Sequence, residues 1–163
     1  MTELIFETVH GSHLYGWAHE GSDMDIFRVT TSTNHKALQK HVGGLDIVTV
    51  GLDTFLARAL SGSHQSVEAL FSTEKVWYND TYRPMLESIR VCGGEVFEKY
   101  ERTIKKFCYG DFKKRRHACR LHLNLHELRK YGKFDPKVEQ PAAVLANTYA
   151  KLYEGDELWS ALS

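Results

Sequence analysis

The sequence predicts an α/β (α+β) protein in which a small mixed β-sheet packs against a helical C-terminal half. Three observations lead to this class. Short runs of β-branched and apolar residues, typical of strands, fall within the first 50 residues. A helical pattern then extends almost without interruption from residue 80 to residue 163. Apolar residues make up 42% of the 163 residues, which is enough for a core in one compact domain or a domain with a helical annex.

Three strands are predicted, at residues 4–9, 24–29 and 45–50. The first strand ends at His10-Gly11, and the third follows a turn at Gly43-Gly44. The segment 12–21 is predicted to be a loop that has room for one helical turn. Because the third strand can pair with its neighbour in either direction, we expect a mixed sheet rather than a purely parallel one.

Two short helices should complete the first half, at residues 53–62 and 66–71, with Asp53 or Thr54 as the N-cap of the first. A short extended piece is expected near Trp77. Five further helices are predicted beyond residue 80, separated by glycine or proline: residues 81–91, 95–109, 111–131, 142–153 and 157–162. We therefore divide the chain into residues 1–79 and residues 80–163.

The overall charge is balanced, with 21 basic and 21 acidic residues, so no bulk electrostatic signal for nucleic acid is present. The basic run at residues 113–116 is the one local candidate for a nucleic-acid contact. No secretory signal, transit peptide or long apolar segment is recognisable, so we expect a cytoplasmic protein that does not enter a membrane. The three cysteines have no metal-binding spacing and are expected to be reduced.

Two carboxylates, Asp23 and Asp25, lie two positions apart at the start of the second predicted strand. Such residues share one face of a strand, and the repulsion between them is relieved by a hard divalent cation. Upstream, Gly11-Ser12 can form a tight turn whose N–H groups and hydroxyl face an anion, and Ser22 would orient the loop before the pair. A phosphate cradle beside paired carboxylates indicates metal-assisted phosphoryl or nucleotidyl transfer. The alternative is a turn cap at Asp23 and a solvated strand residue at Asp25.

The spacing of these motifs resembles the DNA polymerase β-like nucleotidyltransferase superfamily. The shared pattern is Gly-Ser at residue 11, followed by Ser-Asp-x-Asp and an apolar residue from residue 22. Tyr15-Gly16 and the run Ile-Phe-Arg-Val from residue 26 are more similar to one branch, the RNA-ligase-associated polymerase-β-like nucleotidyltransferases of bacteria and phages. The resemblance is strong over residues 5–71 and weaker to residue 132. It implies a catalytic core in residues 1–79 and a helical region, residues 80–163, that completes the cleft.

At the level of residues, the resemblance implies that Gly11 and Ser12 hold the β- and γ-phosphates of a nucleoside triphosphate such as ATP. Asp23 and Asp25 would bind Mg²⁺, with Mn²⁺ as the alternative metal. A third acidic residue on a neighbouring strand completes the site in this superfamily and often activates the attacking hydroxyl, and Asp46 fits that role. Two Mg²⁺ ions about 3.5–4 Å apart would then clamp the attacking and leaving oxygens.

Asp53 competes with Asp46 for the third position, although it lies where a helix cap is needed. The expected reaction moves a nucleoside monophosphate from the triphosphate to a hydroxyl acceptor, with an RNA 3′ end such as that of tRNA as the implied acceptor. A protein or small-molecule hydroxyl is the alternative acceptor. A second hypothesis is a nucleotide-binding toxin–antitoxin or sensor module that acts through a protein partner.

The predicted helix 111–131 has one polar and basic face, formed by Lys113, His117, Arg120 and Asn124 at the i, i+4, i+7, i+11 spacing. A second face, expected to be buried, is formed by Leu121, Leu125 and Leu128. The resemblance assigns a basic residue on a helix to the triphosphate, and Arg120 is the preferred candidate because its planar fork matches phosphate. The alternative is a solvated helix face. The neighbours Lys114, Arg115 and Arg116 are expected at the surface or on an RNA backbone.

Aromatic and histidine residues add weaker signals. Tyr15 and Trp17 offer faces on which a base can stack, although either can equally belong to the core. His13 and His19 lie in the loop of the candidate site and could contact base or ribose, without a spacing rule to support it. His122 and His126, four residues apart on a helix, could bind zinc, but no third ligand is evident nearby, and a polar helix face is the preferred interpretation.

Overall fold

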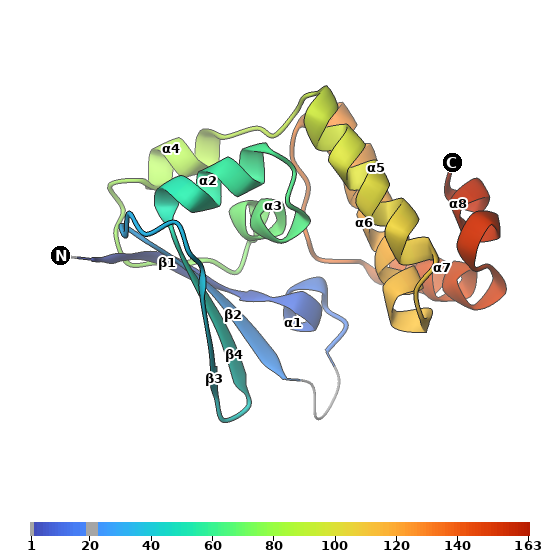
Figure 1. Cartoon of the computed structure of the whole chain (residues 1–163), viewed down its shortest axis with the longest axis horizontal. Helices are drawn as coiled ribbons and strands as arrows, with labels where there is room; N and C mark the ends of the chain where they lie inside the picture. The colour runs from blue at the N-terminus through green and yellow to red at the C-terminus, as the bar shows by residue number, and fades with distance from the viewer. Residues whose placement is uncertain (1, 19–22) are drawn as a thin grey trace.

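The computed structural model describes residues 2–18 and 23–163, and it contains a mixed five-stranded sheet with the strand order β3-β4-β2-β1-β5 (Figure 1). The strands are β1 (Leu4–His10), β2 (Met24–Thr30), β3 (Leu38–Val42), β4 (Leu45–Gly51) and β5 (Val76–Trp77). β2 and β4 are parallel, whereas β1 pairs antiparallel with both β2 and β5, and β3 pairs antiparallel with β4. The predicted mixed sheet and its three longer strands are confirmed.

The helices of the described residues divide into two groups in Figure 1. The first group is α1 (Gly11–Tyr15), α2 (Leu52–Leu60), α3 (His64–Phe71) and α4 (Arg83–Ser88), of which α2, α3 and α4 lie over the sheet. The second group is α5 (Gly94–Cys108), α6 (Phe112–Tyr131), α7 (Gln140–Leu152) and α8 (Gly155–Leu162), which pack beside the sheet as a helical half. The α/β class with a helical C-terminal half is therefore confirmed.

The strand β3 is absent from the sequence-based prediction, although its hairpin turn to β4 at Gly43-Gly44 was recognised. All five residues of β3 are exposed, so the strand buries no side chain that would impose an apolar alternation on the sequence. Gly43 has a φ of 60°, the left-handed conformation that this hairpin requires. The strand is held instead by its antiparallel pairing with β4.

Helix boundaries follow local capping chemistry, with one correction. The side chain of Asp111 accepts the backbone N–H of Lys114 at 2.9 Å and starts α6, and Gly132, with a φ of 72°, ends it. The predicted caps Asp53 and Thr54 are wrong, because α2 starts earlier and its N-cap is Gly51, without a side-chain cap. A Cβ atom at Gly51 would lie 2.1 Å from the carbonyl oxygen of Ser32, which explains a glycine there.

One hydrophobic core joins the sheet and the helical half. On the sheet side, the Phe55 ring packs against Phe6 and Phe27, with ring centroids 5.6 and 5.8 Å apart. On the helical side, the predicted apolar face of α6 is buried, as expected for Leu121, Leu125 and Leu128. The cysteines Cys92, Cys108 and Cys119 are free. Over residues 2–18 and 23–163, no helix combines the length and apolarity needed to span a membrane.

Candidate active site

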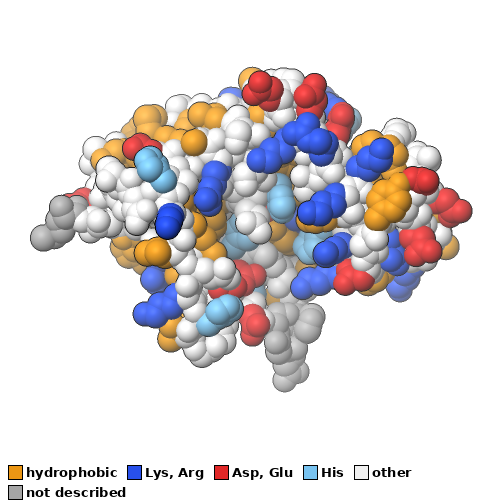
Figure 2. All heavy atoms as spheres, viewed as in Figure 1, with side chains coloured by type: hydrophobic (Ala, Val, Ile, Leu, Met, Phe, Trp, Pro, Cys, Tyr) orange, Lys and Arg blue, Asp and Glu red, His pale blue; other side chains and the backbone are white. Residues whose placement is uncertain are grey.

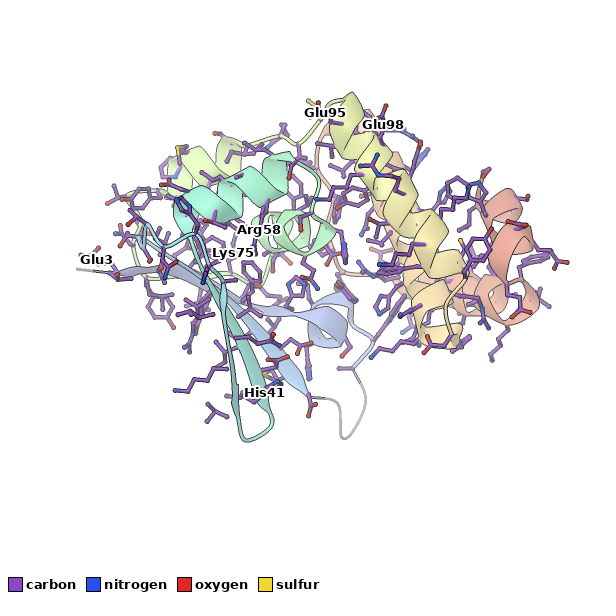
Figure 3. The ribbon with its side chains drawn as sticks, viewed as in Figure 1. Glu3, His41, Arg58, Lys75, Glu95 and Glu98 are labelled. Carbon is purple, nitrogen blue, oxygen red and sulfur yellow. The ribbon has the colours of Figure 1, made fainter. Side chains whose placement is uncertain are left out.

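The sheet aligns acidic and histidine side chains in one row across four strands. In the parallel pairing of β2 and β4, Asp25 lies opposite Asp46, and Asp23 precedes Asp25 by two residues. On the outer sides of this pair, His10 of β1 lies opposite Asp25, and His41 of β3 lies opposite Asp46. His41 is labelled in Figure 3. Residues directly opposite each other in a sheet project from the same face, so the topology brings Asp25 and Asp46 together as the sequence predicted.

The charge of Asp25 is not balanced by its surroundings. Partial burial raises the pKa of Asp25, and the negative charges of Asp46 and Asp23 raise it further, while His13 and Lys113 oppose the shift. A carboxyl group whose pKa is raised in this way is one whose ionised form would gain from a nearby cation. Lys113 belongs to α6 and lines the same cavity as Asp25, so the basic helix faces the acidic end of the sheet.

Asp46 is held by groups from β3. The Gln39 side-chain amide donates to both carboxylate oxygens of Asp46, at 3.1 and 3.2 Å, and His41 Nε2 lies 3.7 Å from Oδ1. Sequence reasoning missed both residues because it missed the strand that carries them. The hairpin turn before β4 was the available signal, since it requires a preceding partner strand.

The carboxylates do not form a closed metal cage. Among the described residues, no group of three or more His, Cys, Asp or Glu side chains is arranged to hold a metal ion by itself. Mg²⁺ is usually bound through only one or two carboxylates, with substrate phosphates and water as its remaining ligands. The register of Asp25 and Asp46 and the raised pKa of Asp25 fit a cation of that kind, one whose shell is completed by a bound nucleotide.

Gly11 lies directly beside Asp25, and Ser12 follows it in the chain. The predicted turn is the start of the short helix α1, which follows β1 without a break. Gly11 has a φ of 61°, and a Cβ atom at this position would lie 2.4 Å from Asp25 Oδ2. Glycine therefore allows the backbone to approach the carboxylate, and any side chain here would displace it.

A cavity of about 400 Å³ extends from this acidic end of the sheet to the N-terminal half of α6. At one end it is lined by Gly11, Ser12 and Asp25, and at the other by Lys113 and His117. Tyr15 and Arg120 also contribute to its wall. A second cavity of about 220 Å³ contains Asp25 and Asp46, and His10 lines both. On the face drawn in Figure 2, Lys and Arg side chains gather over the helical half.

Arg120 does not present its guanidinium to the cavity in the way that the sequence suggested. Its Nη1 lies 2.5 Å from Glu68 Oε1, and its side chain is only 2% exposed. The guanidinium also stacks on the Tyr15 ring, with Cζ 3.6 Å from the centroid. The charge of Arg120 is therefore already paired inside the protein, and its assignment to the triphosphate stays a prediction.

Glu68, which the sequence analysis did not single out, is the centre of a buried network. Its Oε2 accepts the Tyr15 hydroxyl at 2.6 Å and lies 3.6 Å from His10 Nε2. Burial alone would raise the pKa of Glu68, but the positive charge of Arg120 holds the pKa below its usual value. The network joins α1, α3 and α6. No local pattern could reveal it, since the partners Glu68 and Arg120 are 52 residues apart.

An aromatic wall lies between α1 and α6. The His117 ring lies 5.8 Å from the Tyr15 ring and 5.7 Å from the Trp17 ring, measured between centroids. The Arg116 guanidinium stacks over Trp17 at 4.3 Å. These contacts place Arg116 in the cavity wall rather than on an outer surface. The expectations for His19 and Ser22 fall outside the described residues.

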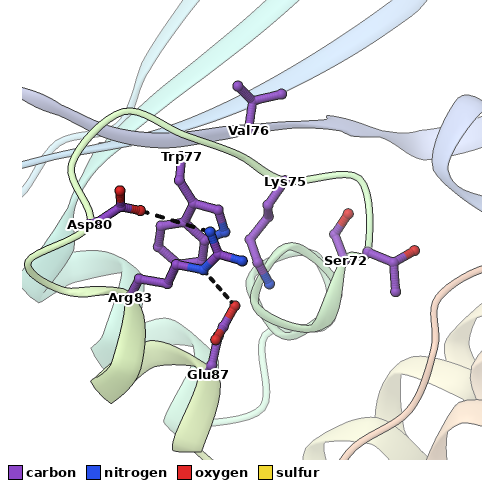
Figure 4. Close-up of a pocket in the computed structure, with 8 residues that line it drawn as sticks. Ser72, Lys75, Val76, Trp77, Asp80, Arg83 and Glu87 are labelled. Carbon is purple, nitrogen blue, oxygen red and sulfur yellow. Dashed lines mark hydrogen bonds and ion pairs between the residues drawn. The ribbon is translucent and has the colours of Figure 1, made fainter.

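The largest cavity described, about 670 Å³, lies near β5 and α4 and not at the carboxylates (Figure 4). Its charged side chains form ion pairs and hydrogen bonds within the protein. Arg83 lies 2.9 Å from Glu87 and 3.8 Å from Asp80, and Lys75 donates to the carbonyl oxygen of Leu70. Because these charges are already paired within the protein, they are not free to bind a ligand, and the end of the sheet that carries Asp25 and Asp46 is the better candidate site.

Compared with known proteins, the chain matches no family model, and the search of curated proteins gave no match either.

Proposed function

We propose that the protein is a Mg²⁺-dependent nucleotidyltransferase. The observation that carries this proposal is the register of Asp25 and Asp46 on neighbouring parallel strands, with Gly11 against the Asp25 carboxylate. In the proposed reaction, a hydroxyl oxygen of the acceptor attacks the α-phosphorus of a nucleoside triphosphate. The bond to the pyrophosphate oxygen breaks, pyrophosphate leaves, and the hydroxyl proton is released.

Each part of the cavity has a role in this reaction. Asp25 and Asp46, with Asp23, would hold Mg²⁺, which supplies charge neutralisation at the phosphates when bound. Gly11 and Ser12 line the cavity, where their backbone N–H groups and the Ser12 hydroxyl would donate hydrogen bonds to phosphate oxygens. Gln39 and His41 keep the Asp46 carboxylate in one orientation.

Cationic side chains at the other end of the cavity support the same ligand. The positive charge of Lys113 acts on Asp25, and this side chain can bind phosphate because an ammonium group does not ligate the metal. Lys114 and Arg116 line the same cavity and are suited to contacts with the phosphate backbone of an acceptor, so we propose an RNA 3′ end as the acceptor. The three free cysteines fit a reducing compartment, and we propose the cytoplasm as the location.

The proposal is tested by incubating the protein with each of the four α-³²P-labelled ribonucleoside triphosphates, Mg²⁺ and total cellular RNA. We expect label in RNA, and we expect its loss when EDTA is added or when Asp25→Asn replaces wild type. Asp53→Asn is the matched control, because Asp53 is an exposed aspartate on α2 outside the cavity. Label in RNA that persists in Asp25→Asn would contradict the assignment of the site. No transfer from any nucleotide to RNA, protein or small molecules would contradict the activity.

A further inference from the structure

The protonation state of His117 is set by its neighbour on α6. Arg120 Nε donates a hydrogen bond to His117 Nδ1, with the two nitrogens 3.3 Å apart. Since a guanidinium has no acceptor, Nδ1 must be the unprotonated nitrogen of the imidazole. The hydrogen of the neutral ring then lies on Nε2, and His117 is a donor at that atom.

The surroundings keep this ring neutral. Burial lowers the pKa of His117 to about 3, and the positive charges of Arg120, Arg116 and Lys113 act in the same direction, while Glu68 opposes them. Arg120 is itself locked by its ion pair with Glu68, so the donor to Nδ1 has a fixed position. His117 is therefore a directed donor without charge over the whole neutral range.

The position of His117 suits a nucleobase better than a phosphate. Its ring contacts those of Tyr15 and Trp17, and the Arg116 guanidinium stacks over Trp17, so flat π-systems border it on two sides. Phosphate recognition gains most from charged donors, and Lys113 in the same cavity supplies such a charge. A neutral donor among aromatic rings matches a flat heterocycle with a ring nitrogen or carbonyl acceptor on its edge.

We propose that His117 determines the base specificity of the nucleotide site by donating from Nε2 to an acceptor atom of the nucleobase. This inference rests on the proposed function, because it requires a nucleotide in the cavity. Arg120 and Glu68 are positioning residues in this arrangement, since they act on the base only by fixing the tautomer and orientation of His117.

Two substitutions distinguish the roles of the two ring nitrogens of His117. The side-chain oxygen of His117→Asn can replace Nδ1 as the acceptor for Arg120, but it leaves no donor at the position of Nε2. The amide nitrogen of His117→Gln can reach the position of Nε2 and restore the donor, although Arg120 loses its acceptor. Affinities would be measured by calorimetry for the four non-hydrolysable ribonucleoside triphosphates and for inorganic tripolyphosphate, which has no base.

We expect wild type to prefer one or two bases and to bind tripolyphosphate. His117→Asn should weaken binding of the preferred nucleotide about five- to tenfold, the usual effect of one neutral hydrogen bond, and should leave tripolyphosphate unchanged. His117→Gln should retain part of the preference. An equal loss for tripolyphosphate would show that His117 contacts phosphate, and an unchanged base preference in His117→Asn would equally overturn the inference.

Failure of the proposed function gives a different result. If wild type binds neither the nucleotides nor tripolyphosphate, the nucleotide site is wrong and base specificity falls with it. If wild type binds all four nucleotides equally, only base specificity is overturned. Nitrogen-15 NMR of the free protein checks the tautomer independently. Between pH 5 and 8 the His117 signal should show protonation at Nε2 alone, and a proton on Nδ1 would overturn the inference.

Discussion

Two charged regions of the molecule use carboxylates in opposite ways. At the end of the sheet, Asp25 and Asp46 lie opposite each other in register, and the negative charge of Asp46 helps to raise the pKa of Asp25. Inside the junction with α6, Glu68 is fully buried and faces an arginine 2.5 Å away. The first region leaves negative charge available for a ligand, whereas in the second region the carboxylate is neutralised by an arginine of the protein itself.

This difference indicates that the Glu68 region stabilises the fold, whereas the Asp25 region is available to bind a ligand. A buried carboxylate with a matched arginine and further hydrogen bonds contributes to the folded state, and the loss of one partner leaves an expensive unpaired charge. Aligned, partly exposed carboxylates cost folding free energy unless a cation joins them. We therefore expect substitutions in the two regions to change the free energy of unfolding in opposite directions.

The largest effect is expected for Glu68→Gln. This substitution leaves the Arg120 guanidinium buried without a counterion, and loss of one partner of a buried pair typically costs about 3–5 kcal/mol of unfolding free energy. Urea denaturation monitored by fluorescence would measure it. Glu101→Gln is the control, because the Glu101–Arg129 pair is exposed and its loss should cost at most about 1 kcal/mol. Equal costs for the two variants would show that the junction does not depend on its ion pair.

A smaller effect is expected for Gly11→Ala. The new Cβ would lie 2.4 Å from Asp25 Oδ2, so the carboxylate must move, and the residue must also keep a φ of 61°. Gly43→Ala is a matched control, because Gly43 has nearly the same φ, 60°, and no atom lies within 4 Å of its added Cβ. Strain of this kind costs about 1–3 kcal/mol in either variant. Nucleotide transfer should fall only in Gly11→Ala. Equal activity in the two variants would show that Gly11 is not part of the active site.

The smallest change is a modest gain in stability in Asp25→Asn. Because the folded-state pKa of Asp25 is raised, its protonated form stabilises the fold fully below the unfolded value of 3.8, and this contribution is lost as pH rises through the folded pKa. The asparagine imitates the protonated state, so without metal the variant should melt above wild type at pH 7. The difference should shrink toward pH 3.5. A variant that melts well below wild type at pH 7 would show that Asp25 is a structural cap.

The sequence was sufficient where local patterns determine the outcome. The strands β1, β2 and β4 have apolar runs, and α6 is bounded by an aspartate cap and a glycine, so each could be predicted. The exposed strand β3 has no such pattern, and with it the contacts of Gln39 to Asp46 were missed.

Partners that are distant in the chain were the main source of error at the site. The face of α6 that carries Arg120 was recognised as polar, and the charge of Arg120 was assigned to a ligand. Its partner in the structure, Glu68, lies on α3, 52 residues away. No sequence pattern around either residue indicates this ion pair. Burial distinguishes a cation that binds a ligand from one that holds the fold, and burial depends on the tertiary structure.

The distance between Glu68 and Arg120 along the chain also concerns how the protein is made. Residues 2–79 leave the ribosome before Arg120 does, and they contain the sheet and a glutamate whose arginine partner is still to be synthesised. At about 5–20 residues per second, Arg120 follows Glu68 after roughly 3–10 s. During that interval Glu68 cannot form its ion pair with Arg120. Synthesis of α6 therefore sets the earliest time at which the wall of the cavity can close.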